Sequence, residues 1–222
     1  MALASDESVP RKAPQFDDAF RDKLAELLAW RRDVRRFRAD PLDEAELEAL
    51  FDLAELSPSV GNSQPWRWVR FDGAAARAAV RASFARCNAA ALADQSGGRA
   101  ALYATLKLEG LDRAPAQFAV FCDRATAQGH GLGAATMPEA LDYSVVAQIV
   151  AFWIAARARG LGLGWVSILD PADVAKAAGA PPDWRFVAYL CIGLPSEEHD
   201  VPELQRAGWQ ARTGRGRTVA RV

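Results

Sequence analysis

The sequence predicts an α+β fold, one domain in which long helices pack against a sheet of about four short strands. Two patterns predict it: long segments with apolar residues at helical spacing, and short apolar runs bounded by glycine, proline or polar residues. The 222 residues are half apolar and one quarter charged, which is globular composition and enough chain for a sizeable core. We expect residues 1–15 to form a flexible tail and residues 16–222 a single domain with an extended C-terminal arm.

The first half of the chain is predicted to be mainly helical. Residues 16–30 place apolar side chains on one helical stripe. A second helix begins after Asp43, whose carboxylate can cap it, and ends before Ser57, because the residue that precedes a proline is disfavoured in helical dihedrals. The other elements expected here are a strand and two helices, at residues 66–71, 74–94 and 99–110.

The second half alternates strands with helices and loops. Residues 129–138 are rich in glycine and lack periodicity, so we interpret them as a mobile loop. Residues 140–159 form a long helix that is apolar around most of its circumference; we expect it to be deeply buried and a candidate for a subunit contact. Asp170 and Pro171 begin a further helix with a cap and a first-turn proline. The polar tail after Glu197 has few core candidates and would need a partner surface to become ordered. Strands are expected at residues 117–122, 163–168 and 185–192.

Charge and cysteine content narrow the function classes. The formal net charge is −1, so the chain has no bulk attraction to nucleic acid or to an anionic membrane. Basic residues are nevertheless concentrated in residues 31–38, which suits a small anionic ligand better than a polymer. Three scattered cysteines do not make a disulfide framework, and we expect Cys122 and Cys191, which lie in apolar runs, to be buried reduced thiols.

Two further patterns bear on localisation. The N-terminal residues 1–15 mix charged side chains without an apolar core, so they do not resemble a secretory signal. The most apolar part of the long helix, residues 145–156, is interrupted by Gln148 and is too short to cross about 30 Å of hydrocarbon. We therefore expect a cytoplasmic protein that does not enter a membrane.

Several kinds of site are not indicated. His130 and His199 are the only histidines, and neither has a cysteine nearby, so no metal site is expected. Residues 160–164 look like a dinucleotide fingerprint but precede a strand instead of following one, which is the wrong context. We find no Ser-His-Asp set, phosphate loop or nucleic-acid surface.

The most informative segment runs from Arg31 to Phe37 and reads Arg-Arg-Asp-Val-Arg-Arg-Phe. If the preceding helix continues, Arg31 and Arg35 are one turn apart, so both guanidinium groups could reach one phosphate. The alternative is a solvated basic helix end, where cations offset the helix dipole. From the local sequence alone, the solvated helix end is the favoured interpretation.

A second segment, residues 57–66, reads Ser-Pro-Ser-Val-Gly-Asn-Ser-Gln-Pro-Trp. It offers short hydroxyls and amides between two prolines, with Gly61 available for an unusual backbone angle. A flavin needs such a mixture of donors and acceptors for its pyrimidine edge and ribityl hydroxyls. A surface turn that precedes a strand is the alternative.

Together with residues 164–171, these two segments resemble the FMN-binding nitroreductase-like flavoproteins, and the resemblance covers roughly residues 20–212. It implies a central mixed, mainly antiparallel sheet flanked by helices, and a homodimer whose flavin sites are each built from both subunits. It also implies that the matching arginines hold the FMN phosphate and ribityl chain; Arg215 and Arg217 compete with Arg212 for that role. The FMN-binding residues implied are Arg31, Arg32, Asp33, Val34, Arg35, Ser57, Ser59, Asn62, Gln64, Gly164, Trp165, Ser167 and Arg212.

Asp33 separates this chain from most of that family, in which a small hydroxyl residue is usual at the matching position. A carboxylate there resembles the oxygen-dependent branch that consumes its own flavin, converting reduced FMN into 5,6-dimethylbenzimidazole, the lower ligand base of vitamin B12, and erythrose 4-phosphate. By this resemblance Asp33 is a general base that neighbouring guanidinium groups keep ionised, and Ser167 lies near the reactive ring. Without it, Asp33 could be a salt-bridge spacer of little energetic weight, and Ser167 could bond to the backbone.

The resemblance also implies a lid and a redox partner, and two other functions compete with the one that it implies. A lid would exclude bulk water from an oxygen reaction. A flavin reductase would supply reduced FMN, and molecular oxygen would be the co-substrate. The competitors are an NAD(P)H-dependent nitroreductase or flavin reductase, and a non-catalytic FMN-binding protein. The residues assigned to the lid are Gly131, Met137, Pro138, Glu139, Tyr143 and Ser144.

Overall fold

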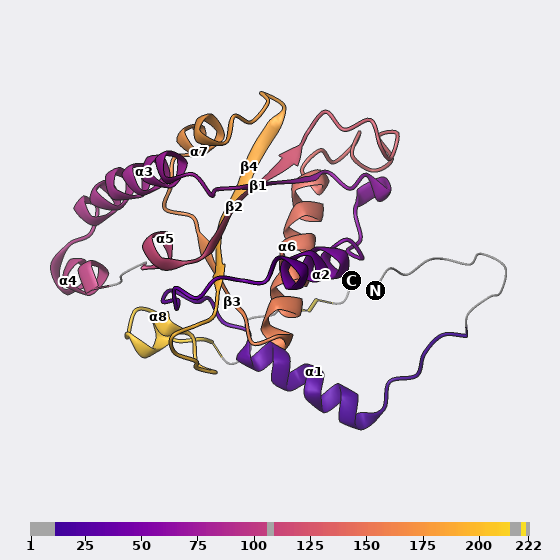
Figure 1. Cartoon of the computed structure of the whole chain (residues 1–222), viewed down its shortest axis with the longest axis horizontal. Coiled ribbons are helices and arrows are strands. Elements are labelled where there is room, and N and C mark those ends of the chain that lie inside the picture. Colours follow the sequence, from indigo (N-terminus) through magenta and orange to yellow (C-terminus); the bar gives the residue numbers. More distant parts are fainter. Residues whose placement is uncertain (1–11, 106–108, 214–218, 221–222) are drawn as a thin grey trace.

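The computed structural model describes residues 12–105, 109–213 and 219–220 and shows three layers, with helices on both faces of a four-stranded sheet (Figure 1). The strand order is β1-β2-β4-β3, and all three strand pairings are antiparallel. The expected mainly antiparallel sheet is confirmed, and its one parallel feature is an isolated bridge between Asp33 and Leu163. The strands are β1 (Trp66–Arg70), β2 (Ala116–Asp123), β3 (Gly162–Val166) and β4 (Trp184–Gly193).

The helices agree with most of the expected boundaries. Asp17, Asp43 and Asp170 each accept a backbone N–H at a helix start, which confirms the predicted caps at Asp43 and Asp170. The short α5, α8 and the 3-10 turn η1 were not predicted, because elements of three or four residues carry no measurable periodicity. The helices are α1 (Asp18–Trp30), α2 (Glu44–Ala54), η1 (Val60–Asn62), α3 (Ala74–Ala93), α4 (Gly97–Thr105), α5 (Gly110–Arg113), α6 (Ala140–Ala158), α7 (Pro171–Ala178) and α8 (Glu203–Arg206).

Strand β2 divides the core into two halves. Alternate side chains, such as Phe118 and Val120, face α2 and α6, while Ala119 and Phe121 face α3 and α7. Every residue of β2 except its last is buried, because both faces of the sheet are covered. In the strand order β1-β2-β4-β3, strand β3 lies at an edge of the sheet. The candidate site lies along that edge.

Helix α6 is buried on one face only. Val145, Ile149 and Phe152 are fully buried against the sheet, whereas Val146 and Val150 keep 37% and 40% of their surface exposed. The expectation of burial around most of the helix is therefore wrong for the single chain. At 19 residues α6 has almost the expected length, but the expectation that its apolar stretch is too short does not hold: among the described helices it is the one whose length and composition would allow it to cross a membrane. Its contacts with all four strands are those of a core helix.

Helix α1 has no buried residue. The stripe predicted from its spacing exists, but Phe20, Leu24 and Leu28 on it remain 40% to 47% exposed. The helix lies across the C-terminal end of α6 (Figure 1). Two neighbouring helices thus leave apolar side chains uncovered in the single chain.

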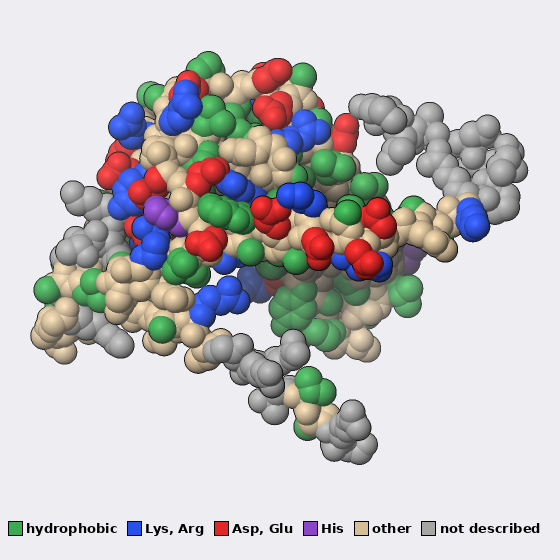
Figure 2. All heavy atoms as spheres, turned by 90° about the horizontal axis from the view of Figure 1, so that it is seen from below, with side chains coloured by type: hydrophobic (Ala, Val, Ile, Leu, Met, Phe, Trp, Pro, Cys, Tyr) green, Lys and Arg blue, Asp and Glu red, His purple; other side chains and the backbone are tan. Residues whose placement is uncertain are grey.

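The arm that follows β4 is ordered by its own chain. Arg38 donates its N–H to the Leu194 carbonyl, and Ser196 donates its N–H to the Arg36 carbonyl, so the start of the arm pairs with the basic segment. These two bonds place the start of the arm, before Glu197, and Arg32 donates to the Asp200 carbonyl beyond it; that the tail after Glu197 needs a partner surface stays a prediction. Acidic and basic side chains are intermixed on the face that carries α1 and this arm (Figure 2).

Candidate active site

The basic segment is extended and lies along the free edge of β3. Helix α1 ends at Trp30, Arg31 already has extended dihedrals, and Val34 donates its N–H to the Leu163 carbonyl at 3.0 Å. The proposed helical turn between Arg31 and Arg35 therefore does not exist, because the chain leaves the helix one residue earlier. What holds the segment in place is the unpaired edge of the sheet.

Gly164 allows this close approach. A Cβ at this position would overlap the Val34 carbonyl oxygen, and one at Gly162 would lie 2.7 Å from a Val34 methyl group. The partner in this close approach is the chain's own basic segment. These glycines therefore position Asp33 through its neighbour.

Asp33 is fixed by the strand that it borders. Its Oδ1 accepts the Trp165 N–H at 2.8 Å, and its Oδ2 lies 3.6 Å from the Arg35 Nε, which is too long for a hydrogen bond. The side chain keeps 37% of its surface, so one oxygen remains reachable. The carboxylate is thus held firmly on one side and open on the other.

Loss of hydration raises the pKa of the Asp33 carboxyl above its usual range. The Trp165 N–H and Arg35 oppose that rise, and the negative charge of Glu203 adds to it. The neighbouring guanidinium groups were expected to keep this carboxyl ionised; Arg35 does favour the ionised form, but burial opposes it with the larger effect on the pKa. A carboxylate with a raised pKa is a stronger base than a solvated one.

Three arginines form a positive cluster beside Asp33. Arg31 lies 4.2 Å above the centre of the Trp153 ring, and Arg32 donates from Nε to the Asp200 carbonyl at 2.6 Å. Burial lowers the pKa of both guanidinium groups, and repulsion among Arg31, Arg32 and Arg212 lowers it further. A bound anion would offset the repulsion among these like charges. The residues present therefore fit a phosphate group.

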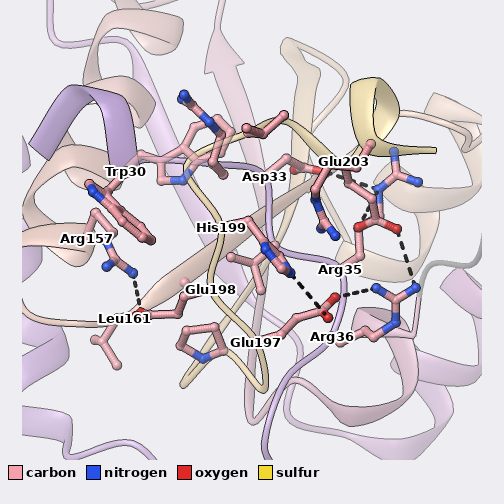
Figure 3. Close-up of a pocket in the computed structure, with 17 residues that line it drawn as sticks. Trp30, Asp33, Arg35, Arg36, Arg157, Leu161, Glu197, Glu198, His199 and Glu203 are labelled. Carbon is pink, nitrogen blue, oxygen red and sulfur yellow. Dashed lines mark hydrogen bonds and ion pairs between the residues drawn. The ribbon is translucent and has the colours of Figure 1, made fainter. Parts of the chain in front are cut away.

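Arg35 and Arg36 face acidic side chains of the C-terminal arm. Figure 3 shows Glu203 between them. Arg36 pairs with Glu197 at 2.6 Å and with Glu203 at 3.4 Å, and the Arg35 Nε lies 3.8 Å from Glu203. Arg35 is therefore placed beside Asp33 and Glu203, and the structure does not group it with Arg31.

Ser167 lies just past the end of β3. The expected strand over residues 163–168 is found at residues 162–166; it stops two residues early, at Val166, so Ser167 is exposed instead of buried in the strand. The Asp33 side chain reaches the Trp165 backbone, two residues and roughly 7 Å along the chain from Ser167. Both candidate catalytic groups thus lie at the same end of the same edge strand.

The polar segment at residues 57–64 is a strained turn. Gly61, Asn62 and Gln64 all have left-handed dihedrals, which is unusual for a glutamine. The Ser59 hydroxyl accepts the Gln64 N–H at 3.1 Å and holds this turn, while the buried Ser57 hydroxyl has no partner among the described residues. Strain and an unpaired hydroxyl are features that functional sites show more often than plain turns.

This turn lies at the opposite end of α6 from Asp33. The Val60 N–H donates to the Ser144 hydroxyl near the start of α6, whereas Arg31 stacks on Trp153, nine residues later. Nine residues of helix span about 14 Å. The residues assigned to one flavin site therefore form two separate groups within one chain.

The glycine-rich loop lies on this turn and not over Asp33. Gly61 is so close to the loop that a Cβ there would meet the Leu132 carbonyl at 2.8 Å. Ser144 is 5% exposed, donates to the Ala140 carbonyl at 2.7 Å and accepts the Val60 N–H, so it lies at the base of this loop. The other lid residues are exposed, but within one chain they cannot cover Asp33. They are Gly131, Met137, Pro138, Glu139 and Tyr143.

Some neighbours of the site had no signal in the sequence. Glu203 belongs to a polar tail, and Trp153 and Arg157 look like ordinary members of a long helix. Cys122 and Cys191 are buried free thiols, as expected, and burial raises the pKa of Cys122 to about 12. Within the described residues, no three His, Cys, Asp or Glu side chains are grouped to hold a metal ion.

The layered fold and the basic segment on its sheet edge define a known class. The chain belongs to the nitroreductase family, whose model matches residues 28–194. A solved iodotyrosine deiodinase, bound to FMN and 3-iodo-L-tyrosine, has this fold with a TM-score of 0.68 at 20% identity, covering 89% of this chain and 97% of that one.

Within that class, the chain is most informatively compared with two 5,6-dimethylbenzimidazole synthases. The protein from Rhodospirillum rubrum is 61% identical over 202 residues, 91% of this chain and 96% of that protein. One from Rhodobacter capsulatus is 53% identical and covers 88% of this chain and 94% of its own length. An NADH dehydrogenase of Thermus thermophilus is 32% identical, and the match covers 76% of this chain and 84% of that protein. The predicted resemblance to the flavin-consuming branch is thereby confirmed.

Proposed function

We propose that this protein converts reduced FMN and molecular oxygen into 5,6-dimethylbenzimidazole and erythrose 4-phosphate, and so supplies the lower ligand of cobalamin. The observation that carries the proposal is the Asp33 carboxylate, held by the Trp165 N–H beside a cluster of arginines that repel one another. Its support from relatives is the 61% identity with a named 5,6-dimethylbenzimidazole synthase.

The chain's own residues have separable tasks in this reaction. Arg31, Arg32 and Arg212 would hold the phosphate of FMN, since their mutual repulsion is relieved by an anion. Asp33 would accept a proton through its free Oδ2, while its Oδ1 stays bonded to β3. Ser167 would donate a hydrogen bond to the ring edge from its exposed position. When bound, reduced FMN supplies the electrons for oxygen and the carbon skeleton of the product.

We also propose a homodimer in which each site is shared. One chain separates the arginine cluster from the turn at residues 57–64 by the length of α6, and a flavin that needs both must take the turn from a second copy. The uncovered apolar side chains of α1 and α6, including Leu28 and Val150, offer the surface for that copy. On this arrangement the glycine-rich loop would cover the partner's flavin.

The activity is tested by adding reduced FMN to the purified protein in air. Chromatography should detect 5,6-dimethylbenzimidazole in proportion to the protein, and the flavin absorbance should not return fully. A matched sample without protein should return oxidised FMN. Quantitative recovery of FMN without benzimidazole would refute the proposal, and steady oxidation of NAD(P)H with intact FMN would instead favour a nitroreductase.

The source of reduced FMN is a separate element of the proposal. FMN would be consumed as a substrate, so a flavin reductase must deliver it in the reduced form. Adding a reductase and NADH in place of chemically reduced FMN should sustain product formation. Product formation with NADH alone, without any reductase, would remove the need for that partner.

A further inference from the structure

Glu203 of the C-terminal arm shares a cation with Asp33. The Arg35 Nε lies 3.6 Å from Asp33 Oδ2 and 3.8 Å from Glu203 Oε2, and it makes no hydrogen bond to any described residue. Arg35 and Glu203 keep only 12% and 16% of their side-chain surface, so water screens them little. One buried guanidinium group thus faces two carboxylates and is bonded closely to neither.

The position of Glu203 is set by its surroundings. Arg36 bonds to it at 3.4 Å and to Glu197 at 2.6 Å, and it also lies 3.8 Å from Glu109. The arm is tied to the basic segment by the backbone bond from Ser196 to Arg36 and by the Arg32 bond to the Asp200 carbonyl. Glu203 is therefore held beside Arg35 by contacts independent of Arg35 itself.

We propose that Glu203 is a positioning residue for Asp33: by holding Arg35 between two carboxylates, it prevents a close Asp33–Arg35 ion pair and keeps Asp33 available as a base. The inference rests on the proposed role of Asp33 in the reaction. It gives the C-terminal arm a function in the site that its sequence does not suggest.

The electrostatics support this arrangement. Asp33 faces Arg31 and Arg35 of its own segment, Glu203 of α8, the Cys191 thiol of β4 and the Trp165 N–H of β3. A close pair with Arg35 would lower the pKa of Asp33 and make it a weaker base. Glu203 opposes this twice, because its negative charge disfavours ionisation of Asp33 and because it attracts the same guanidinium group.

The test compares Glu203→Gln with Glu197→Gln. Both changes remove a carboxylate that pairs with Arg36 on the same arm, but only the first removes one that faces Arg35. In Glu203→Gln the acidic limb of the pH profile for benzimidazole formation should move to lower pH, and the plateau rate should fall. Glu197→Gln should leave the limb in place, and Glu203→Asp should restore it at least in part.

A direct titration separates this inference from the proposed function. Carbon-13 NMR of labelled aspartate carboxyls, with Asp33 assigned by its loss in Asp33→Asn, should show a lower pKa for Asp33 in Glu203→Gln than in the unaltered protein. An unchanged Asp33 titration, or an equal shift in Glu197→Gln, would overturn the role of Glu203. If the titration moves but no benzimidazole forms in any variant, the proposed reaction fails and the positioning effect stands.

Discussion

Replacing Asp33 by asparagine should separate its chemical role from its structural one. The side-chain oxygen of the introduced asparagine can still accept the Trp165 N–H, so the edge of β3 should keep its geometry. The basicity is lost, and loss of a positioned base typically lowers the rate about 10²–10⁴-fold, equivalent to roughly 2.7–5.5 kcal/mol of activation free energy. FMN affinity should change far less, because the phosphate contacts lie on other residues.

The same substitution should not cost stability at neutral pH. The pKa of Asp33 is raised in the folded state, so its contribution to stability is fully present below the unfolded value of about 3.9 and is lost as the pH rises through the folded value. Asp33→Asn escapes that loss. Its melting temperature should match that of the unaltered protein in acid and exceed it near pH 7, by an amount that the 37% exposure of Asp33 keeps small.

Two control variants make the result interpretable. Asp33→Ala also removes the acceptor for Trp165, so it should melt lower than Asp33→Asn. Asp40→Asn should show the opposite pH trend. A bond from Arg38 lowers the pKa of Asp40, so the Asp40 carboxylate stabilises the fold at neutral pH, and this stability is lost as the pH falls through the lowered pKa. The assays are product chromatography, flavin titration and calorimetry across pH. Near-normal product from Asp33→Asn would demote Asp33 to a structural residue, and a lower melting temperature than the unaltered protein at pH 7 would refute the electrostatic reasoning.

The remaining predictions concern the phosphate, the sheet edge and the dimer. Arg31→Ala and Arg212→Ala should each weaken FMN binding roughly ten- to hundredfold in a fluorescence titration, since a charged hydrogen bond contributes about 1.5–3 kcal/mol; unchanged affinity would remove that residue from the phosphate site. Gly164→Ala should destabilise the fold by about 1–3 kcal/mol in denaturant unfolding, because its Cβ overlaps a neighbouring carbonyl, whereas Gly98→Ala meets open space and should not. Val150→Glu should convert a dimer to a monomer in light scattering and reduce FMN binding with it; a variant that stays dimeric would place the interface elsewhere.

The elements that the sequence predicted well are those whose pattern is local. Asp43 and Asp170 cap helices because the cap depends on a few adjacent residues, and the apolar run of β2 reports burial on both faces. The basic segment was identified correctly but given the wrong geometry. Its conformation is set by pairing with Leu163, more than a hundred residues away, and no local pattern reports that.

The candidate site was predicted as a set of residues and not as an arrangement. The arginines at positions 31, 32 and 212 were expected to meet. They lie close enough for mutual repulsion to lower the pKa of Arg31 and Arg32, in addition to the effect of burial. The sequence could not say which subunit's flavin the glycine-rich loop would cover, because glycine content reports mobility but not location. Glu203 escaped notice because a carboxylate in a polar tail is indistinguishable from any solvated one until its neighbours are known.

In the proposed shared site, the length of α6 would keep the two halves apart within one chain. Its start holds the strained turn through Ser144, and its later turns hold the arginine cluster through Trp153. A rigid helix keeps these two groups apart, and its outward face carries uncovered valines instead of polar residues. A second copy that covered those valines would remove apolar surface from water and could bring its own turn to the first copy's arginines. Burial of one face of α6 and completion of the flavin site would then be the same event, which is why loss of the dimer should abolish FMN binding before it unfolds the chain.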